Sequence, residues 1–272
     1  MGINEELEKV YRLKWDALIN NGYEMINKIL NDSSDSKSSF NDITSKEIKS
    51  NKELKNIPSN PLLLKVDENE IENADIKVMF FGQETLGWHR FGTSLTEEMD
   101  GYEKYYYHGK KTNKFWSHGI EFFKRSLSEF YRKEDKSVAY LWNNISKMGR
   151  YQNKVGVPKN IKDLEREHFH SIIKEEVKII NPDIIIFLTG DRNNDIKFNF
   201  GNVKFEDIHY NATLKSKNGK RNFKKAQKII LEDFNHIKCV KLYHPSYFGG
   251  FNNIKDDALK LIKNEEKDEQ YR

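Results

Sequence analysis

The sequence is poor in cysteine and proline and lacks long apolar runs. Its 272 residues include one cysteine, Cys239, and five prolines. A single cysteine excludes an intramolecular disulfide framework, a cysteine-based zinc site and a four-cysteine iron–sulfur cluster. We therefore expect a reducing, cytoplasmic environment.

Apolar residues are never continuous enough to predict a membrane segment. No stretch approaches the ~18 consecutive apolar residues of a membrane helix, and residues 1–10 lack the basic-then-apolar order of a signal peptide. We expect no association with membranes.

Charge is abundant but nearly balanced. Lys and Arg number 46 against 42 for Asp and Glu, which gives a net charge of +4. This excess is too small to establish a polyanionic partner by itself. Residues 213–228 are nevertheless locally basic, and this stretch is either a solvated surface or a phosphate-binding one. Its basic residues are Lys215, Lys217, Lys220, Arg221, Lys224, Lys225 and Lys228.

The length allows one sizeable α/β domain with an extension, or two small domains. Apolar residues at helical spacing within residues 4–31 predict one or two amphipathic helices. Residues 31–56 are rich in Ser, Asn and Lys, which is typical of a mobile linker or exposed loop. We predict N-terminal helices and a linker over residues 1–58, followed by an α/β domain over residues 59–272.

Four short apolar segments, each followed by a polar or glycine-bearing turn, predict buried strands. They are residues 76–82, 138–144, 183–190 and 239–246. Helical patterns lie between them over residues 115–133 and 163–181. Alternating strands and helices predict a three-layer αβα fold around a central four-stranded, mostly parallel sheet.

Polar side chains follow all four predicted strands, and ligands of such sheets bind outside the carboxyl ends of the strands. The strand ends carry Gln83-Glu84, Asn143-Asn144, Thr189-Gly190-Asp191 and His244-Pro245-Ser246. Taken singly, each also has a plain structural interpretation as a helix cap, a turn residue or a hydrogen-bonded histidine. If the strands are parallel, these residues collect at one edge of the sheet.

Two of these motifs, in this order, resemble those of the uracil-DNA glycosylase superfamily. "GQET" at residues 82–85 is similar to its first motif, and "HPSY" at residues 244–247 to its late His-Pro-Ser motif. The resemblance covers roughly residues 60–262 and leaves out the N-terminal helices. It implies a monomeric, monofunctional DNA glycosylase that needs no metal or cofactor. Such an enzyme flips a base out of DNA and hydrolyses its N-glycosidic bond, leaving an abasic site.

The resemblance also implies catalytic roles. His244 matches the histidine that donates a hydrogen bond toward the base oxygen as negative charge develops there. Glu84 stands where the best-known branch has an aspartate that orients or activates water, and Gln83 could share this task.

Further residues match the parts of the family that hold the base and the DNA. Asn143 or Asn144 would read the base edge, with Asn143 preferred, while Phe115 or Trp116 would stack on the base or belong to the core. Ser246 matches a serine that grips a phosphate. A wedge replacing the flipped base could come from Tyr247, Phe248 or Phe251. The basic stretch could contact the phosphate backbone through Lys215, Lys217, Lys220 and Arg221.

The chain also departs from the family pattern. Thr85 replaces a proline, and Leu86 falls where uracil-specific relatives have a tyrosine that blocks the 5-position of the pyrimidine. These departures, and Glu84 in place of aspartate, suggest a substrate larger than uracil, such as a hypermodified base of phage DNA. The sequence leaves open repair or antiviral defence.

Two other functions compete with the glycosylase. One is a glycosylase-like nucleic-acid-binding module that has lost its chemistry. The other is a nucleotide or small-ester hydrolase, which is disfavoured because the sequence has no Gly-x-Ser-x-Gly motif and no phosphate-binding loop ending in Lys-Ser/Thr.

Overall fold

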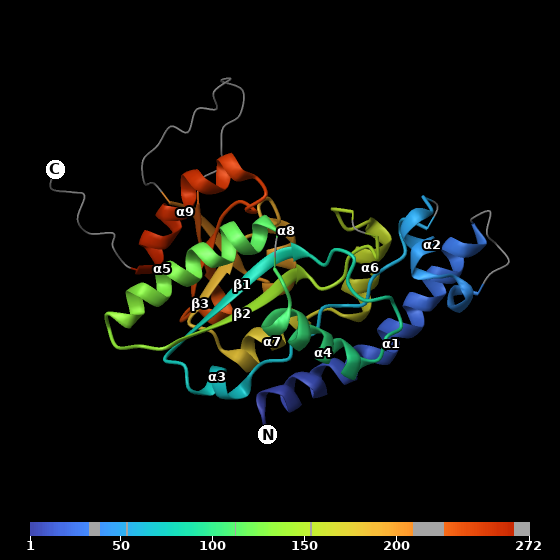
Figure 1. Cartoon of the computed structure of the whole chain (residues 1–272), viewed down its shortest axis with the longest axis horizontal. Coiled ribbons are helices and arrows are strands. Elements are labelled where there is room, and N and C mark those ends of the chain that lie inside the picture. The colour runs from blue at the N-terminus through green and yellow to red at the C-terminus, as the bar shows by residue number, and fades with distance from the viewer. Residues whose placement is uncertain (33–38, 53, 112, 153, 209–225, 264–272) are drawn as a thin grey trace, which may run out of the picture. The chain divides into compact units, whose positions relative to one another are not determined.

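The computed structural model describes residues 1–32, 39–52, 54–111, 113–152, 154–208 and 226–263. These residues form an α/β fold with a mixed sheet of six strands. Figure 1 shows strands of this sheet together with helices that pack on it. The described helices are α1 (Ile3–Asn31), α2 (Ser45–Ser50), α3 (Glu68–Glu72), α4 (Leu95–Glu103), α5 (Glu121–Arg132), α6 (Lys159–His168), α7 (Ile172–Ile180), α8 (Asn193–Phe200) and α9 (Phe248–Lys263). Shorter helical turns are η1 (Phe40–Asp42), η2 (Lys104–His108), η3 (Phe115–Ile120) and η4 (Glu232–Phe234).

The sheet has the strand order β2-β1-β3-β6-β5-β4. Its strands are β1 (Ile76–Glu84), β2 (Val138–Ser146), β3 (Ile184–Phe187), β4 (Val203–Asp207), β5 (Gln227–Leu231) and β6 (Lys238–Lys241). β3 pairs in parallel with both β1 and β6, whereas β5 pairs antiparallel with β6 and β4.

The α/β class is confirmed, but the predicted number of four strands is wrong. All four predicted strands are present as β1, β2, β3 and β6, and the sheet extends beyond β6 by β5 and β4. The segment that forms β4, "VKFED", mixes apolar and charged residues and is mostly exposed. It therefore lacks the continuous apolar run by which the buried strands were identified.

Helices cover both faces of the sheet, which is compatible with a three-layer αβα arrangement. Neighbouring residues of β1 point to opposite faces. Phe80 contacts Phe123 of α5, with ring centroids 6.4 Å apart, while Phe81 contacts Phe200 of α8 at 6.2 Å. The core of the sheet is therefore aromatic on both sides of β1.

The chain divides into two compact units, each assembled from separate stretches. Unit 1 comprises Met1–Glu68, Glu84–Gly109 and Asn144–Ile180, and unit 2 comprises Asn69–Gln83, Lys110–Asn143 and Asn181–Arg272. Residues 1–58 are therefore part of unit 1, and the predicted domain boundary at residues 58 and 59 stays a prediction.

The N-terminal helix is confirmed as one continuous element, α1, which packs on α6 and α7. Within unit 1, Tyr11 of α1 donates a hydrogen bond to Glu176 of α7 at 2.6 Å, and Lys147, just after β2, contacts the same carboxylate at 2.6 and 2.9 Å. All three side chains are buried. Burial lowers the pKa of Lys147, against the attraction of Glu176, and raises the pKa of Tyr11.

Two predictions about local structure need correction. The described part of the predicted linker forms η1 and α2 and buries Phe40, Ile43 and Ile48, so it is not an exposed loop. The helix predicted over residues 163–181 is two helices, α6 and α7, separated near Ser171. Ser171 has a φ of 64°, which no α-helix accommodates.

Candidate functional site

Three strand ends of unit 2 meet at one edge of the sheet. Because β1, β3 and β6 are parallel, the residues that follow them emerge on the same side. Gln83 Nε2 donates to the carbonyl oxygen of Thr189 at 2.9 Å. A Cβ atom on Gly190 would lie 3.4 Å from Gln83 Nε2 and 3.8 Å from the backbone nitrogen of His244. The predicted convergence of these three motifs is therefore present within unit 2.

His244 has a defined ring orientation and protonation. Its imidazole stacks on Phe115, with ring centroids 5.4 Å apart and planes inclined by 16°. The backbone N–H of Ser246 donates to His244 Nδ1 at 3.2 Å, so Nδ1 is the acceptor and the neutral ring carries its proton on Nε2. Burial lowers the pKa of His244 to about 4. Near neutral pH the ring is thus an uncharged hydrogen-bond donor through Nε2.

The predicted stacking residues Phe115 and Trp116 are both buried. Trp116 packs edge-on against Trp142 of β2, with centroids 5.1 Å apart. Behind them, a Cβ atom on Gly119 would fall 2.4 Å from Pro245 Cγ, so the His-Pro-Ser segment approaches η3 as closely as glycine allows. Phe115 is therefore a candidate residue whose ring stacks on His244.

The sequence reasoning missed one residue of this region, Lys111. Its ammonium lies 5.3 Å from the ring centre of Trp116, and burial, followed by the nearby charge of Lys124, lowers the pKa of Lys111. The basic run "GKKTNK" directly before Phe115 was the available signal. Thr189 was named only as a polar residue at the end of its strand; its hydroxyl is buried and has no hydrogen-bond partner among the described residues.

The two candidate base-reading asparagines are both buried. Tyr140 and Trp142 of β2 face α5 and η3, where Tyr140 bonds to Ser128 and Trp142 packs on Trp116. Alternation along the strand then places Asn143 on the opposite face. Asn143 belongs to unit 2 and Asn144 to unit 1. Which of them reads a base stays a prediction.

In unit 1, hydrogen bonds and a close backbone approach connect the end of β1 and the residues after it to the residues after β2. The backbone N–H of Gly156 donates to Glu84 Oε1 at 2.7 Å, and that of Gly87 donates to the carbonyl of Arg150 at 3.3 Å. A Cβ atom on Gly149 would fall 1.8 Å from the carbonyl oxygen of Thr85. Leu86, at the centre of this segment, is 48% exposed.

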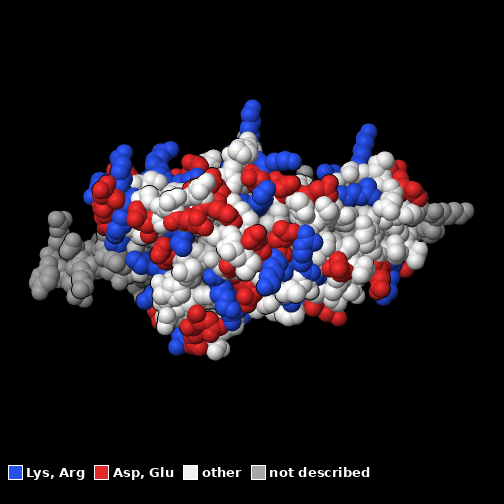
Figure 2. Space-filling model, turned by 90° about the horizontal axis from the view of Figure 1, so that it is seen from below, with Lys and Arg blue, Asp and Glu red and all other residues white. Residues whose placement is uncertain are grey.

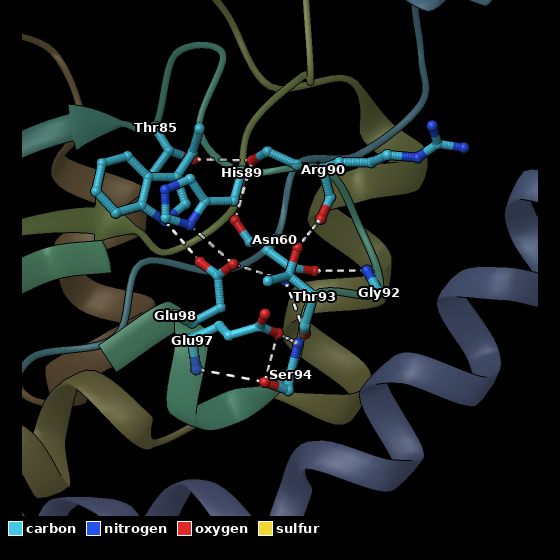
Figure 3. A network of polar contacts seen from close by, with 11 residues as sticks. Asn60, Thr85, His89, Arg90, Gly92, Thr93, Ser94, Glu97 and Glu98 are labelled. Carbon is cyan, nitrogen blue, oxygen red and sulfur yellow. Dashed lines mark hydrogen bonds and ion pairs between the residues drawn. The ribbon is translucent and has the colours of Figure 1, made fainter. Parts of the chain in front are cut away.

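Trp88 and His89, which follow Gly87, both bind a buried carboxylate (Figure 3). Glu98 of α4 is fully buried and accepts hydrogen bonds from Asn60 Nδ2 at 2.9 Å, Trp88 Nε1 at 2.9 Å and His89 Nδ1 at 3.0 Å. The rings of Trp88 and His89 stack on each other at 4.7 Å. The hydrogen bond to Glu98 raises the pKa of His89. These contacts hold Trp88 and His89 against α4.

The predicted DNA-contacting residues fall into three groups. Ser246 and Tyr247 are exposed, Tyr247 to 62%. Phe251 is fully buried in α9, so its assignment as an exposed wedge is corrected: the ring belongs to the core. The side chain of Phe248, the first residue of α9, and the basic residues Lys215, Lys217, Lys220 and Arg221 lie outside the described residues.

Charges are mixed on the face shown in Figure 2, where basic and acidic side chains are interspersed. Within the described ranges, no three or more His, Cys, Asp or Glu side chains come together as metal ligands could. Among the helices described, none has both the length and the apolar character needed to cross a membrane. Compared with models of protein families and with curated proteins, the chain matches no family model and no curated protein.

Proposed function

We propose that the protein is a DNA glycosylase that hydrolyses the N-glycosidic bond of a flipped uracil or modified pyrimidine. The observation that carries the proposal is the neutral imidazole of His244, which bears its proton on Nε2, stacks on Phe115 and shares a sheet edge with Gln83. A base leaving as an anion requires a preorganised hydrogen-bond donor at its oxygen. An uncharged Nε2–H supplies one without transferring a proton to the intact substrate.

The proposed reaction has two requirements: a group that stabilises the departing base and a group that orients the attacking water. As the bond between C1′ of the sugar and the base nitrogen breaks, both electrons go to the base and the sugar becomes cation-like. His244 would stabilise the base anion, while Glu84, which follows Gln83 in the chain, would orient water toward C1′ and accept its proton. The base anion then takes a proton from solvent. The products are the free base and an abasic site.

The proposed substrate class rests on Leu86, the residue after Thr85. Thr85 is buried, and its hydroxyl lies 3.2 Å from that of Ser59. Leu86 is 48% exposed, and the family resemblance puts it where uracil-specific relatives have a tyrosine that excludes substituents at the 5-position of the base. We therefore propose pyrimidines with a 5-substituent, including the hypermodified bases of phage DNA, as substrates alongside uracil.

The test is cleavage of end-labelled oligonucleotides carrying uracil, hydroxymethyluracil, hydroxymethylcytosine or glucosylated hydroxymethylcytosine, followed by heating in alkali. We expect strand scission at one of these bases. Glu84→Gln should slow it about 100-fold or more while DNA binding persists. Glu129→Gln, at an exposed carboxylate of α5, is the matched control and should leave the rate unchanged.

Two outcomes would contradict the proposed glycosylase activity. Binding of these oligonucleotides without any abasic product would indicate the inactive binding module instead. Absence of both binding and cleavage would remove nucleic acid as the ligand.

A further inference from the structure

Gly156 contacts the carboxylate on which the proposed reaction depends. Its backbone N–H donates to Glu84 Oε1 at 2.7 Å, across 72 residues of sequence. Hydrogen bonds from an amide to an ionised carboxylate are shorter and roughly twice as strong as neutral ones. This contact lies entirely within unit 1.

Glycine is not required at position 156 by a lack of room for a side chain. A Cβ atom on Gly156 would have no neighbour within 4 Å, so a larger side chain would fit. The backbone, however, has a φ of 88°, which residues with a side chain rarely adopt. Glycine therefore provides a backbone conformation here, and that conformation presents the N–H to Glu84.

The segment that carries Gly156 is anchored on both sides of Arg150. Tyr151 N donates to the carbonyl of Ile57 at 3.0 Å, and Gln152 Nε2 donates to the carbonyls of Ile48 and Asn51 at 2.6 and 2.8 Å. Together with the close approach of Gly149 to Thr85, these contacts hold residues 149–152, which precede Gly156, within unit 1.

Glu84 has particular need of such a contact. A glutamate has one more rotatable bond than an aspartate, so its carboxylate samples more positions and loses more entropy when it is held in one. Catalytic groups lose rate when they stray from the reactive geometry by about 1 Å. An amide that binds one carboxylate oxygen reduces this freedom.

We propose that Gly156 is a positioning residue: its amide holds the Glu84 carboxylate in the orientation that directs water. This inference rests on the proposed glycosylase function. Gly156 itself touches neither the substrate nor the water in this role and acts through Glu84.

The experiment compares substitutions that differ in their tolerance of a positive φ. In Gly156→Val, the β-branched side chain should disfavour the positive φ, so that the amide no longer points at Glu84. Single-turnover base excision should then slow about 10-fold, while the Kd for DNA changes less than about twofold. In Gly156→Asn, the residue tolerates a positive φ and should keep the rate within about threefold of wild type. Gly201→Val is the matched control, because Gly201 has a φ of 76° and no neighbour within 4 Å of its Cβ position. Its rate should not change.

A double-mutant cycle separates positioning from a general structural effect. If Gly156 acts through Glu84, Gly156→Val should not slow the Glu84→Gln protein any further. The same loss in both backgrounds, or a wild-type rate in Gly156→Val, would overturn the inference while leaving the glycosylase intact. A wild-type protein that excises no base overturns the proposed function, and the role of Gly156 with it.

Discussion

Burial favours the uncharged form of His244 in the folded protein, and this links the proposed role of His244 to stability. Its pKa falls from an ordinary value of 6.5 to about 4 because the ring is buried. Between these values the unfolded chain binds a proton that the folded protein does not. The free energy of unfolding therefore decreases as the pH falls from about 6.5 toward 4.

We predict that this single group costs up to about 3 kcal/mol of stability between pH 7 and pH 4. His244→Gln cannot bind the proton, so its free energy of unfolding should depend less on pH over this range. Urea unfolding at several pH values measures the difference. Equal slopes for His244→Gln and wild type would contradict the prediction.

At the residue scale, the sequence predicted which polar residues would follow the strands, but it did not predict the contacts that these residues make. The apolar runs before Gln83 and His244 predicted parallel strands, and parallel strands bring their ends together. The stack of His244 on Phe115 could not be foreseen, because two adjacent aromatic residues offered the same chemistry. Gly156 is one of 15 glycines, and its bond to Glu84 spans 72 residues. No local pattern distinguishes it.

At the scale of elements, a buried ion pair joins α1, α7 and the end of β2. Lys147 and Glu176 are both fully buried, and Tyr11 adds a hydrogen bond to the carboxylate while accepting one from the Leu64 amide at 3.0 Å. Removing one member of such a pair leaves the other charge without compensation in an apolar interior.

We predict that Lys147→Met destabilises the protein by about 3–5 kcal/mol, because Glu176 is left buried and unpaired. Adding Glu176→Gln should recover most of this loss, since the amide is neutral and still accepts from Tyr11. Denaturant unfolding of the wild type, both single variants and the double variant measures the coupling. A double variant no more stable than Lys147→Met alone would show that packing, and not charge, dominates.

Elements were predicted well where the apolar pattern was regular and poorly where it was not. β1, β2, β3 and β6 followed from continuous apolar runs, and the helix α1 followed from apolar residues at helical spacing. The edge strand β4 was missed because charged residues interrupt it. The break at Ser171 was missed because a single residue with positive φ leaves no mark on apolar spacing.

At the scale of the whole molecule, the chain passes between the two units five times, at residues 68/69, 83/84, 109/110, 143/144 and 180/181. Two of these passages fall between Gln83 and Glu84 and between Asn143 and Asn144. Neither unit is therefore a continuous piece of sequence. The N-terminal residues 1–58 are part of unit 1 and contribute the fully buried side chains of Leu7, Tyr11 and Leu18 to it.

We predict that a chain beginning at residue 59 does not fold cooperatively, although the family resemblance begins at about the same place. Unit 1 would lose the apolar face of α1, at roughly 1.5–3 kcal/mol for each large buried side chain. Circular dichroism during heating should show a broad or absent transition for the shortened chain. A sharp transition at the wild-type temperature would mean that α1 is dispensable.

The interleaved order of the units also sets a sequence of events during synthesis. Unit 1 has all its residues once Ile180 has left the ribosome, so Glu84 and Gly156 can meet while the remaining chain is still being made. Unit 2 has to wait for its last strand, β6, and for the His-Pro-Ser segment behind it. Phe115 and Gln83 are therefore translated long before His244, and a chain stalled before residue 238 would contain every residue of unit 1 but lack β6.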